Sequence, residues 1–223
     1  IDKLYFKSLT DDSVGMNKSD FKITLAVDKD ARTLTITDNG IGMTKAEMEE
    51  HLGTIANSGS LQFKKENNLA EDNQIIGQFG VGFYSAFMVA DQVTIDTLSY
   101  KDGATAVHWS CDGGTEFDMA DGTKEGVGTE ITLFLNEDSV EFSNEYRARE
   151  VLERYCSFMP VEIFLSKANA EPEYDTIDEA DVLDTDTVVE HITEEPKEGE
   201  EGEPKQKAKI VRRPVSILSL IHI

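Results

Sequence analysis

The chain of 223 residues has only two cysteines, Cys111 and Cys156, and no Cys-x-x-Cys pair. This excludes a disulfide-rich fold and a zinc site of ordinary spacing, and it favours reduced thiols in the cytoplasm. No apolar run approaches the roughly 18 residues of a membrane span, and no charged-then-apolar leader opens the sequence, so we expect no membrane partner. Basic residues are scarce, with 21 Lys and Arg against 44 Asp and Glu. Because there is no basic stripe, we expect no nucleic-acid partner.

The acidic excess is concentrated toward the end of the chain. Residues 171–209 contain 15 acidic and 4 basic residues, a net charge of -11 out of -23 for the whole chain. The same stretch holds Pro172, Pro196 and Pro204 and almost no aromatic residue. Self-repulsion and a shortage of apolar surface predict a disordered acidic linker, placed at 169–209. Within it, only 181–183 and 188–192 have the composition of short strands.

A first glycine-rich cluster, residues 38–43, reads Asp-Asn-Gly-Ile-Gly-Met. It follows an alternating stretch at 33–37, so Asp38 is expected at a strand end where the chain leaves the sheet. The glycines allow the backbone beside Asp38 to lie close against a flat ring. A buried carboxylate needs a hydrogen-bond donor, which the exocyclic amine of adenine supplies and the keto group of guanine does not. Asp38 is therefore expected to select adenine.

A second cluster, residues 76–83, reads Ile-Gly-Gln-Phe-Gly-Val-Gly-Phe and opens an apolar run, 81–90, that is typical of a buried helix. The backbone N–H groups of Gly77, Gly80 and Gly82 would converge on phosphate oxygens at the positive end of this helix. The pattern is neither G-x-x-x-x-G-K-[ST] nor G-x-G-x-x-G. Taken alone, the first cluster also fits a hairpin turn and the second a tight helix contact. Their combination predicts a nucleotide site.

Together with residues 52–60 and 126–131, these motifs resemble the nucleotide-binding domain of the ninety-kilodalton heat-shock chaperone family. The resemblance runs from residue 1 to 163 and resumes at 209–214. Type II topoisomerases, mismatch-repair ATPases and sensor histidine kinases share only the shorter Asp-x-Gly-x-Gly core. The resemblance implies an α/β two-layer sandwich, in which helices cover one face of a mixed, largely antiparallel sheet and ATP binds between the helices.

The resemblance also implies roles for individual residues. Asp38 would take the adenine amine, directly and through a water that Thr129 also holds, and Phe83 would pack beside the base and sugar. Residues 53–76 resemble a lid that closes over bound ATP. His51 replaces an asparagine of many eukaryotic relatives, which leaves a polar contact at that position open. The residues assigned to ATP or ADP are Asp38, Asn39, Gly42, Met43, Asn57, Gly77, Gln78, Phe79, Gly80, Val81, Gly82, Phe83 and Thr129.

For the intact protein, the resemblance implies an ATP-dependent molecular chaperone in which ATP hydrolysis, with Mg²⁺, drives a homodimeric clamp around client proteins. In this family a helix just before the segment matching residue 1 carries the catalytic glutamate and the magnesium-binding asparagine. We therefore expect no catalytic residue and no metal ligand in this chain, and no hydrolysis by it alone. The alternative is a non-hydrolysing nucleotide-binding or interaction module.

The expected organisation begins with a nucleotide-binding domain at 1–168, truncated at its N-terminus. The acidic linker at 169–209 and the start of a middle domain at 210–217 follow it. The chain ends at 218–223 with Leu-Ser-Leu-Ile-His-Ile, which is the translation of a transposase adaptor used in short-read sequencing. We therefore expect residues 218–223 to be an adaptor artefact.

Overall fold

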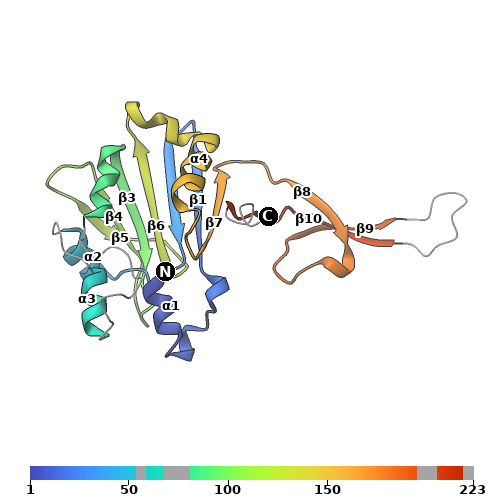
Figure 1. The fold of residues 1–223 in the computed structure, drawn as a ribbon, viewed down its shortest axis with the longest axis horizontal. Coiled ribbons are helices and arrows are strands. Elements are labelled where there is room, and N and C mark those ends of the chain that lie inside the picture. The colour runs from blue at the N-terminus through green and yellow to red at the C-terminus, as the bar shows by residue number, and fades with distance from the viewer. Residues whose placement is uncertain (54–58, 68–80, 195–204, 218–223) are drawn as a thin grey trace, which may run out of the picture. The chain divides into compact units, whose positions relative to one another are not determined.

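A computed structural model describes residues 1–53, 59–67, 81–194 and 205–217 (Figure 1). These residues form two compact units. The first comprises Ile1–Ala168 together with Ser216 and Ile217 from the end of the described chain, and the second comprises Asn169–Val215. Residues 218–223, expected to be an adaptor artefact, lie outside the described part.

The first unit is built on a seven-stranded sheet of order β5-β4-β3-β6-β2-β1-β7. Neighbouring strands are antiparallel except β1 and β7, which are parallel. The predicted mixed, largely antiparallel sheet is therefore confirmed. The strands are β1 (Lys22–Asp28), β2 (Thr33–Asp38), β3 (Ala90–Leu98), β4 (Val107–Cys111), β5 (Asp118–Asp121), β6 (Gly128–Leu135) and β7 (Glu162–Lys167).

The helices of this unit begin at recognisable caps. At the start of α2, Thr44 and Glu47 form a reciprocal capping box, which satisfies N–H groups that have no partner inside the helix. Asn144 caps α4 by accepting from the backbone N–H of Tyr146 and Arg147. The α-helices are α1 (Asp2–Ser8), α2 (Lys45–Leu52), α3 (Gly59–Glu66) and α4 (Glu145–Cys156), and the 3-10 helices are η1 (Asp12–Val14), η2 (Lys18–Asp20), η3 (Gly82–Met88) and η4 (Glu137–Ser143).

Alternation along the strands gives the sheet one apolar face. One buried cluster packs the β3 and β4 side chains, among them Ile95, against α2 and η3, and a second packs Leu25 and Ile163 against α4. Leu25, Ile36, Ile131 and Ile95 are successive register partners, so both clusters lie on the same face. Helices therefore cover one face of the sheet (Figure 1), as predicted. None of the described helices is long and apolar enough to cross a bilayer.

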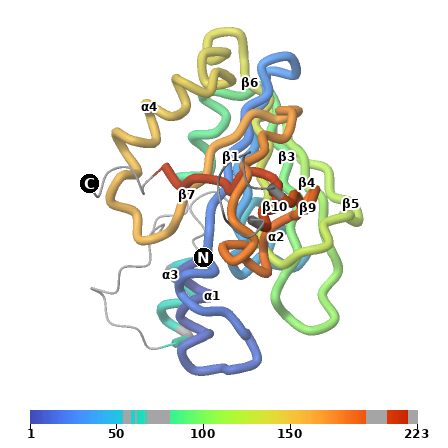
Figure 2. The backbone as a smooth tube through the Cα atoms, turned by 90° about the vertical axis from the view of Figure 1, so that its right-hand side faces the viewer, coloured from blue at the N-terminus to red at the C-terminus, as the bar shows by residue number. Residues whose placement is uncertain are grey.

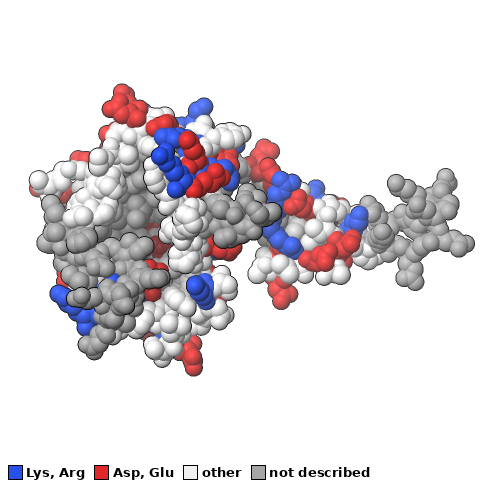
Figure 3. Space-filling model, in the orientation of Figure 1, with Lys and Arg blue, Asp and Glu red and all other residues white. Residues whose placement is uncertain are grey.

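The opposite face of the sheet is mainly polar, and α4 carries charged side chains beside its exposed Tyr146 and Tyr155. Thr35 and Thr132 meet on this sheet face across β2 and β6, with their hydroxyl oxygens 3.1 Å apart. Over α4, side chains of both signs intermingle (Figure 3), because Arg147 pairs with Glu141 at 3.0 Å and Glu150 at 2.7 Å. Exposed pairs of this kind add solubility more than stability.

The prediction of a buried helix at 81–90 is wrong. The described residues form the 3-10 helix η3 over Gly82–Met88, and β3 begins at Ala90. Phe83 and Phe87 pack against the core, but Met88 is 77% exposed. The apolar run is divided between this 3-10 helix and the start of β3. Its composition does not distinguish this arrangement from a single buried helix.

The disordered linker expected at 169–209 is also wrong over the described residues. The second unit is a three-stranded antiparallel sheet of order β8-β10-β9, built from β8 (Tyr174–Asp178), β9 (Val188–Glu194) and β10 (Lys205–Val211), with the 3-10 helix η5 (Glu179–Asp181).

The predicted start of a middle domain at 210–217 is divided between the two units. Ile210 lies in β10, whereas Ser216 bridges to Phe164 of β7 and Ile217 is buried in the first unit.

The acidic segment combines a small apolar centre with local charge pairing. Basic β10 lies between the two more acidic strands, and its Ala208 and Ile210 are buried. Arg213 forms a two-pronged ion pair with Asp186, with Nε–Oδ1 and Nη2–Oδ2 distances of 2.8 and 2.5 Å. Arg212 instead pairs with two different carboxylates, those of Glu173 and Asp175. Net charge alone overlooks these local partners.

The Arg213–Asp186 pair predicts a measurable titration. Hydrogen bonds from Arg213 and from the backbone N–H of Leu183 lower the pKa of Asp186 from 3.8 to about 2. A lowered carboxyl pKa stabilises the folded unit above the unfolded value, and this contribution is lost as the pH falls from about 4 to about 2. In a carbon-13 NMR titration we expect a midpoint near 2, moving toward the ordinary value in Arg213→Gln. Arg212→Gln is the matched control and should leave the Asp186 midpoint in place. An ordinary midpoint in the unmodified chain would contradict the pairing.

Candidate functional site

The site is organised by one row of register partners across three strands. Asp38, the last residue of β2, pairs with Thr129 of β6, and Thr129 pairs with Thr97 of β3. Because partners in register share a face, all three side chains stand on the helix-covered side of the sheet. Thr97 is fully buried and Thr129 is 9% exposed.

The loop after β2, residues 39–44, is fastened to the end of β3. The backbone N–H of Tyr100 donates to the carbonyl of Ile41 at 3.0 Å, and the N–H of Met43 donates to the hydroxyl of Thr97 at 3.0 Å. Gly42 has φ +62°, and a Cβ there would lie 1.9 Å from the carbonyl oxygen of Leu98. Only glycine fits both the backbone angle and the close approach.

The carboxylate of Asp38 is anchored on one side only. Its Oδ1 accepts a hydrogen bond from the N–H of Gly40 at 2.7 Å, and within the described residues Oδ2 has no partner. Gly128 lies against the backbone of Asp38, since a Cβ on Gly128 would come within 2.1 Å of the Asp38 carbonyl oxygen. The sheet and the loop therefore fix the carboxylate and leave one oxygen available to a ligand.

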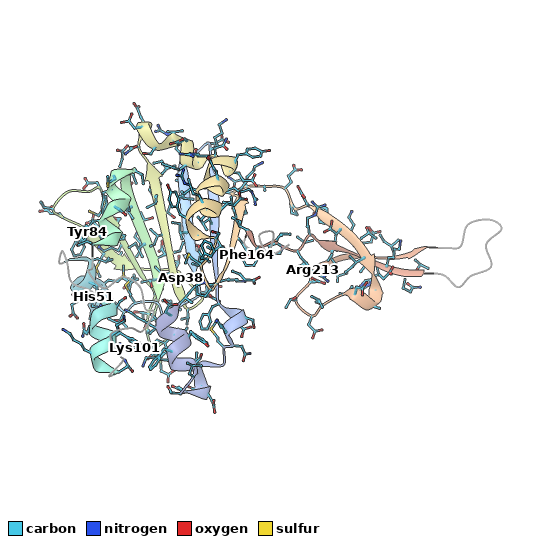
Figure 4. All side chains as sticks on the ribbon, in the orientation of Figure 1. Asp38, His51, Tyr84, Lys101, Phe164 and Arg213 are labelled. Atoms are coloured by element: carbon cyan, nitrogen blue, oxygen red, sulfur yellow. The ribbon has the colours of Figure 1, made fainter. Side chains whose placement is uncertain are left out.

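A cavity of about 590 Å³ opens at this point, a volume ordinary for a small-molecule site. Four of the residues assigned to the nucleotide line it, namely Asp38, Gly42, Met43 and Thr129. The remaining walls come from α1, α2, α3 and the segment after β3. Three of the lining residues are labelled in Figure 4: Asp38 of β2, His51 of α2 and Lys101 of the segment after β3.

The cavity walls carry charges of both signs. Lys3, Lys7 and Lys101 line it together with Glu47 and Asp38. Lys101 bridges to Glu47, with Nζ 2.8 Å from the carboxylate. Burial acts to raise the pKa of Glu47, but hydrogen bonds from Lys101 and Thr44 outweigh it and hold the pKa below its ordinary value. Glu47 therefore both caps α2 and fixes a lysine at the cavity.

The helices α1 and α3 form one wall of the cavity. Phe63 of α3 is buried, and its ring meets that of Phe6 of α1 edge-on at 5.8 Å. The ammonium groups of Lys3 and Lys7 lie 5.9 and 5.7 Å from the centre of the Phe63 ring. Figures 1 and 2 show α1 and α3 side by side. Aromatic and cation–π contacts thus hold α3 beside α1.

His51 lines the same cavity from α2. Its Nδ1 is buried and has no hydrogen-bond partner within the described residues. The ring lies directly against Gly59, since a Cβ on Gly59 would be 2.8 Å from Nε2 of His51. The polar contact that the sequence left open at this position is therefore not made by Nδ1, which is a buried and unsatisfied atom of a residue that lines the cavity.

The other assigned residues lie elsewhere. The side chain of Asn39 accepts from the N–H of Lys22 at 2.8 Å and donates to the carbonyl of Asp20 at 2.7 Å, so it ties down the start of β1. Phe83 packs edge-on against Trp109, with ring centres 5.7 Å apart, and does not line the cavity. Val81, which is 52% exposed, and Gly82 are also absent from its walls. Asn57, Gly77, Gln78, Phe79 and Gly80 lie outside the described residues.

The sequence interpretation missed Thr97. In the alternating run 93–97, Val93 and Ile95 predict a buried face, and Thr97 is the next residue on it. A hydroxyl on an otherwise apolar face needs partners, and this is the signal that could have indicated its role. Tyr100 and Lys101 carry no comparable signal, because they follow the strand in an irregular segment.

Comparison with known proteins shows a similarity over part of the chain. A family model described as "Histidine kinase-, DNA gyrase B-, and HSP90-like ATPase" matches residues 22–117. This range includes both β2, with the loop that follows it, and β3. Over these residues the chain is similar to this family of ATPase domains.

The chain is also similar to bacterial proteins named chaperone protein HtpG. It is 45% identical to that of Bacillus subtilis (strain 168) over 197 residues, covering 83% of the chain and 31% of the relative. It is 43% identical to that of Bacillus velezensis over 196 residues, with the same coverage of both. The match to the Clostridium acetobutylicum protein is 46% over 180 residues, covering 78% and 29%. The chain thus spans about a third of the length of these relatives.

The close approach at Gly42 gives a stability prediction with internal controls. Gly42→Ala combines an unfavourable φ with a clash against Leu98, so we expect a loss of more than about 2 kcal/mol of unfolding free energy. Gly103→Ala has φ +72° but open space, and should lose about 1 kcal/mol. Gly126 also has open space and no positive φ, so Gly126→Ala should change little. Urea unfolding followed by the fluorescence of Trp109, the single tryptophan, measures all three. Equal stability of Gly42→Ala and Gly126→Ala would contradict the close approach.

Proposed function

We propose that this chain binds ATP and ADP in the cavity at the end of β2, with Asp38 recognising the adenine amine. The observation that supports this most strongly is the half-anchored carboxylate. Oδ1 accepts a hydrogen bond from Gly40, while Oδ2 has no partner among the described residues. The cavity that Asp38 lines is large enough for a nucleotide. An amine donor would satisfy that oxygen, whereas a keto oxygen would oppose it.

The residues around Asp38 fit a flat base. Met43 and Gly42 line the cavity beside it, and Gly42 has no side chain to block the approach of a ring. Thr129 adds a hydroxyl on the neighbouring strand. We assign Asp38, Gly42, Met43 and Thr129 to the base. Asn39 supports this arrangement indirectly, because its side chain ties the end of β2 to the start of β1 through hydrogen bonds with the backbone of Lys22 and Asp20.

Phosphate groups would be placed toward the lysines that line the cavity. Lys3, Lys7 and Lys101 line it, and positive side chains favour phosphate oxygens. On the pattern of the family, we keep Asn57, Gly77, Gln78, Phe79, Gly80, Val81 and Gly82 as proposed contacts to the sugar and phosphates, and Phe83 as a support of that loop from the core.

For the intact protein we propose an ATP-hydrolysing chaperone, because the chain is similar to proteins named chaperone protein HtpG. Hydrolysis of a phosphoanhydride bond of ATP would drive the homodimeric clamp. We propose a homodimer acting on client proteins in the cytoplasm. Mg²⁺ would accompany ATP, but no group of three or more His, Cys, Asp or Glu side chains in the described ranges is arranged to hold a metal ion. We therefore assign no residue of this chain to it.

Calorimetric titration with ADP tests the base assignment. Asp38→Asn replaces a charge-assisted hydrogen bond by a neutral one, and we expect ADP affinity to fall about 10- to 100-fold. Asp96→Asn is the matched control. Asp96 lies on β3 but on the opposite face, where it pairs with His108 at 2.9 Å, so its substitution should leave ADP affinity within about twofold.

The same titration with IDP, which has a keto group in place of the amine, should give an affinity at least about tenfold below that for ADP. Equal binding of ADP by the Asp38→Asn variant and the unmodified chain would remove Asp38 from the base site. Absence of ADP binding by the unmodified chain would overturn the proposed function itself.

A further inference from the structure

The proposal rests on the nucleotide function above and concerns a residue without an assigned role. Thr97 is fully buried, and its hydroxyl joins the loop after β2 to the start of β6. It accepts from the N–H of Met43 at 3.0 Å, donates to the carbonyl of Gly128 at 3.0 Å, and lies 3.1 Å from the hydroxyl oxygen of Thr129. Met43 and Thr129 both line the cavity.

The hydrogen count of a hydroxyl decides the direction of the third bond. A threonine hydroxyl has one hydrogen to donate and two lone pairs to accept with. The hydrogen of Thr97 is used on Gly128, and one lone pair is used by Met43. The bond between the two threonines can then form only if Thr129 donates its hydrogen to Thr97. All the capacity of the Thr97 hydroxyl is thereby used.

This direction has a consequence for the ligand. Once the hydrogen of Thr129 is committed to Thr97, the lone pairs of its oxygen are all that it can offer to the cavity. Thr129 then acts as an acceptor, beside the acceptor Oδ2 of Asp38 on the adjacent strand. Two acceptors side by side match a donor such as an amine, or a water that donates to both, and oppose a keto oxygen.

We propose that Thr97 is a specificity-determining positioning residue: it fixes the hydroxyl of Thr129 as an acceptor and thereby selects purines that carry an amine. Asp38 alone provides part of this selection. Thr97 prevents Thr129 from rotating its hydrogen into the cavity and accommodating the keto form.

The test compares the ratio of ADP to IDP affinity among variants of the full chain. Thr97→Val keeps the shape and removes the hydroxyl, which frees Thr129 to donate, so the preference for ADP should fall at least about fivefold. Thr97→Ser keeps the hydroxyl and should keep the preference within about twofold. Thr35→Val is the matched control, because it removes a threonine–threonine hydrogen bond from the opposite face of the same sheet. It should leave the preference unchanged even where it lowers stability.

Two further measurements separate a positioning role from general destabilisation. Amide exchange at Met43 should accelerate in Thr97→Val and not in Thr35→Val, with or without nucleotide. In a double-mutant cycle, Thr97→Val should have no further effect on the preference once Thr129→Val is present, because the group that Thr97 orients is gone. If Thr97→Val does not fold, Thr97→Cys, which keeps a weak donor and acceptor, should give an intermediate preference.

The outcomes are distinguishable. If the unmodified chain binds no ADP, the proposed function fails, and this inference fails with it. If the unmodified chain prefers ADP but Thr97→Val keeps the full preference, the base site stands and the role of Thr97 is refuted. An equal loss of preference in Thr35→Val and Thr97→Val would likewise refute it, since the effect would then follow stability rather than the hydroxyl.

Discussion

The antiparallel register of β2, β6 and β3 is the constraint on which the site depends. It places Asp38, Thr129 and Thr97 in one row on the covered face of the sheet. A shift of any of these strands by one residue would turn its side chain to the polar face. The apolar partners in the same strands, such as Ile36, Ile131 and Ile95, fix that register because each must remain buried or half-buried. Core packing and ligand recognition are therefore set by the same alignment.

The loop after β2 converts this row into a binding surface. Its attachment to β3 through Tyr100 and Thr97, and the contact of Gly42 with Leu98, hold Met43 beside Asp38. The walls that complete the cavity are built differently. The contact between α1 and α3 includes one buried aromatic ring, one edge-on aromatic partner and two lysines. Each of these contacts is individually weak.

Much of this arrangement could be predicted from sequence, and the failures have physical causes. The end of β2 at Asp38 and the need for glycine at Gly42 follow from local patterns that the fold preserves. The hydroxyl of Thr97 on an apolar strand face was a local signal, but its partners, Met43 and Gly128, are distant in sequence and meet it only in the fold. The second unit was missed because the net charge of residues 171–209 does not reveal that Arg213 and Asp186 meet. Phe83 lies beside the glycine cluster in sequence but packs against Trp109 in the core.

A structure of the chain determined with bound ADP tests the central claim most directly. The account predicts the adenine ring in the cavity beside Met43, with its amine within hydrogen-bond distance of Asp38 Oδ2 and with Thr129 facing it as an acceptor, directly or through one water. A base bound with its amine turned away from Asp38, or outside this cavity altogether, would contradict the account.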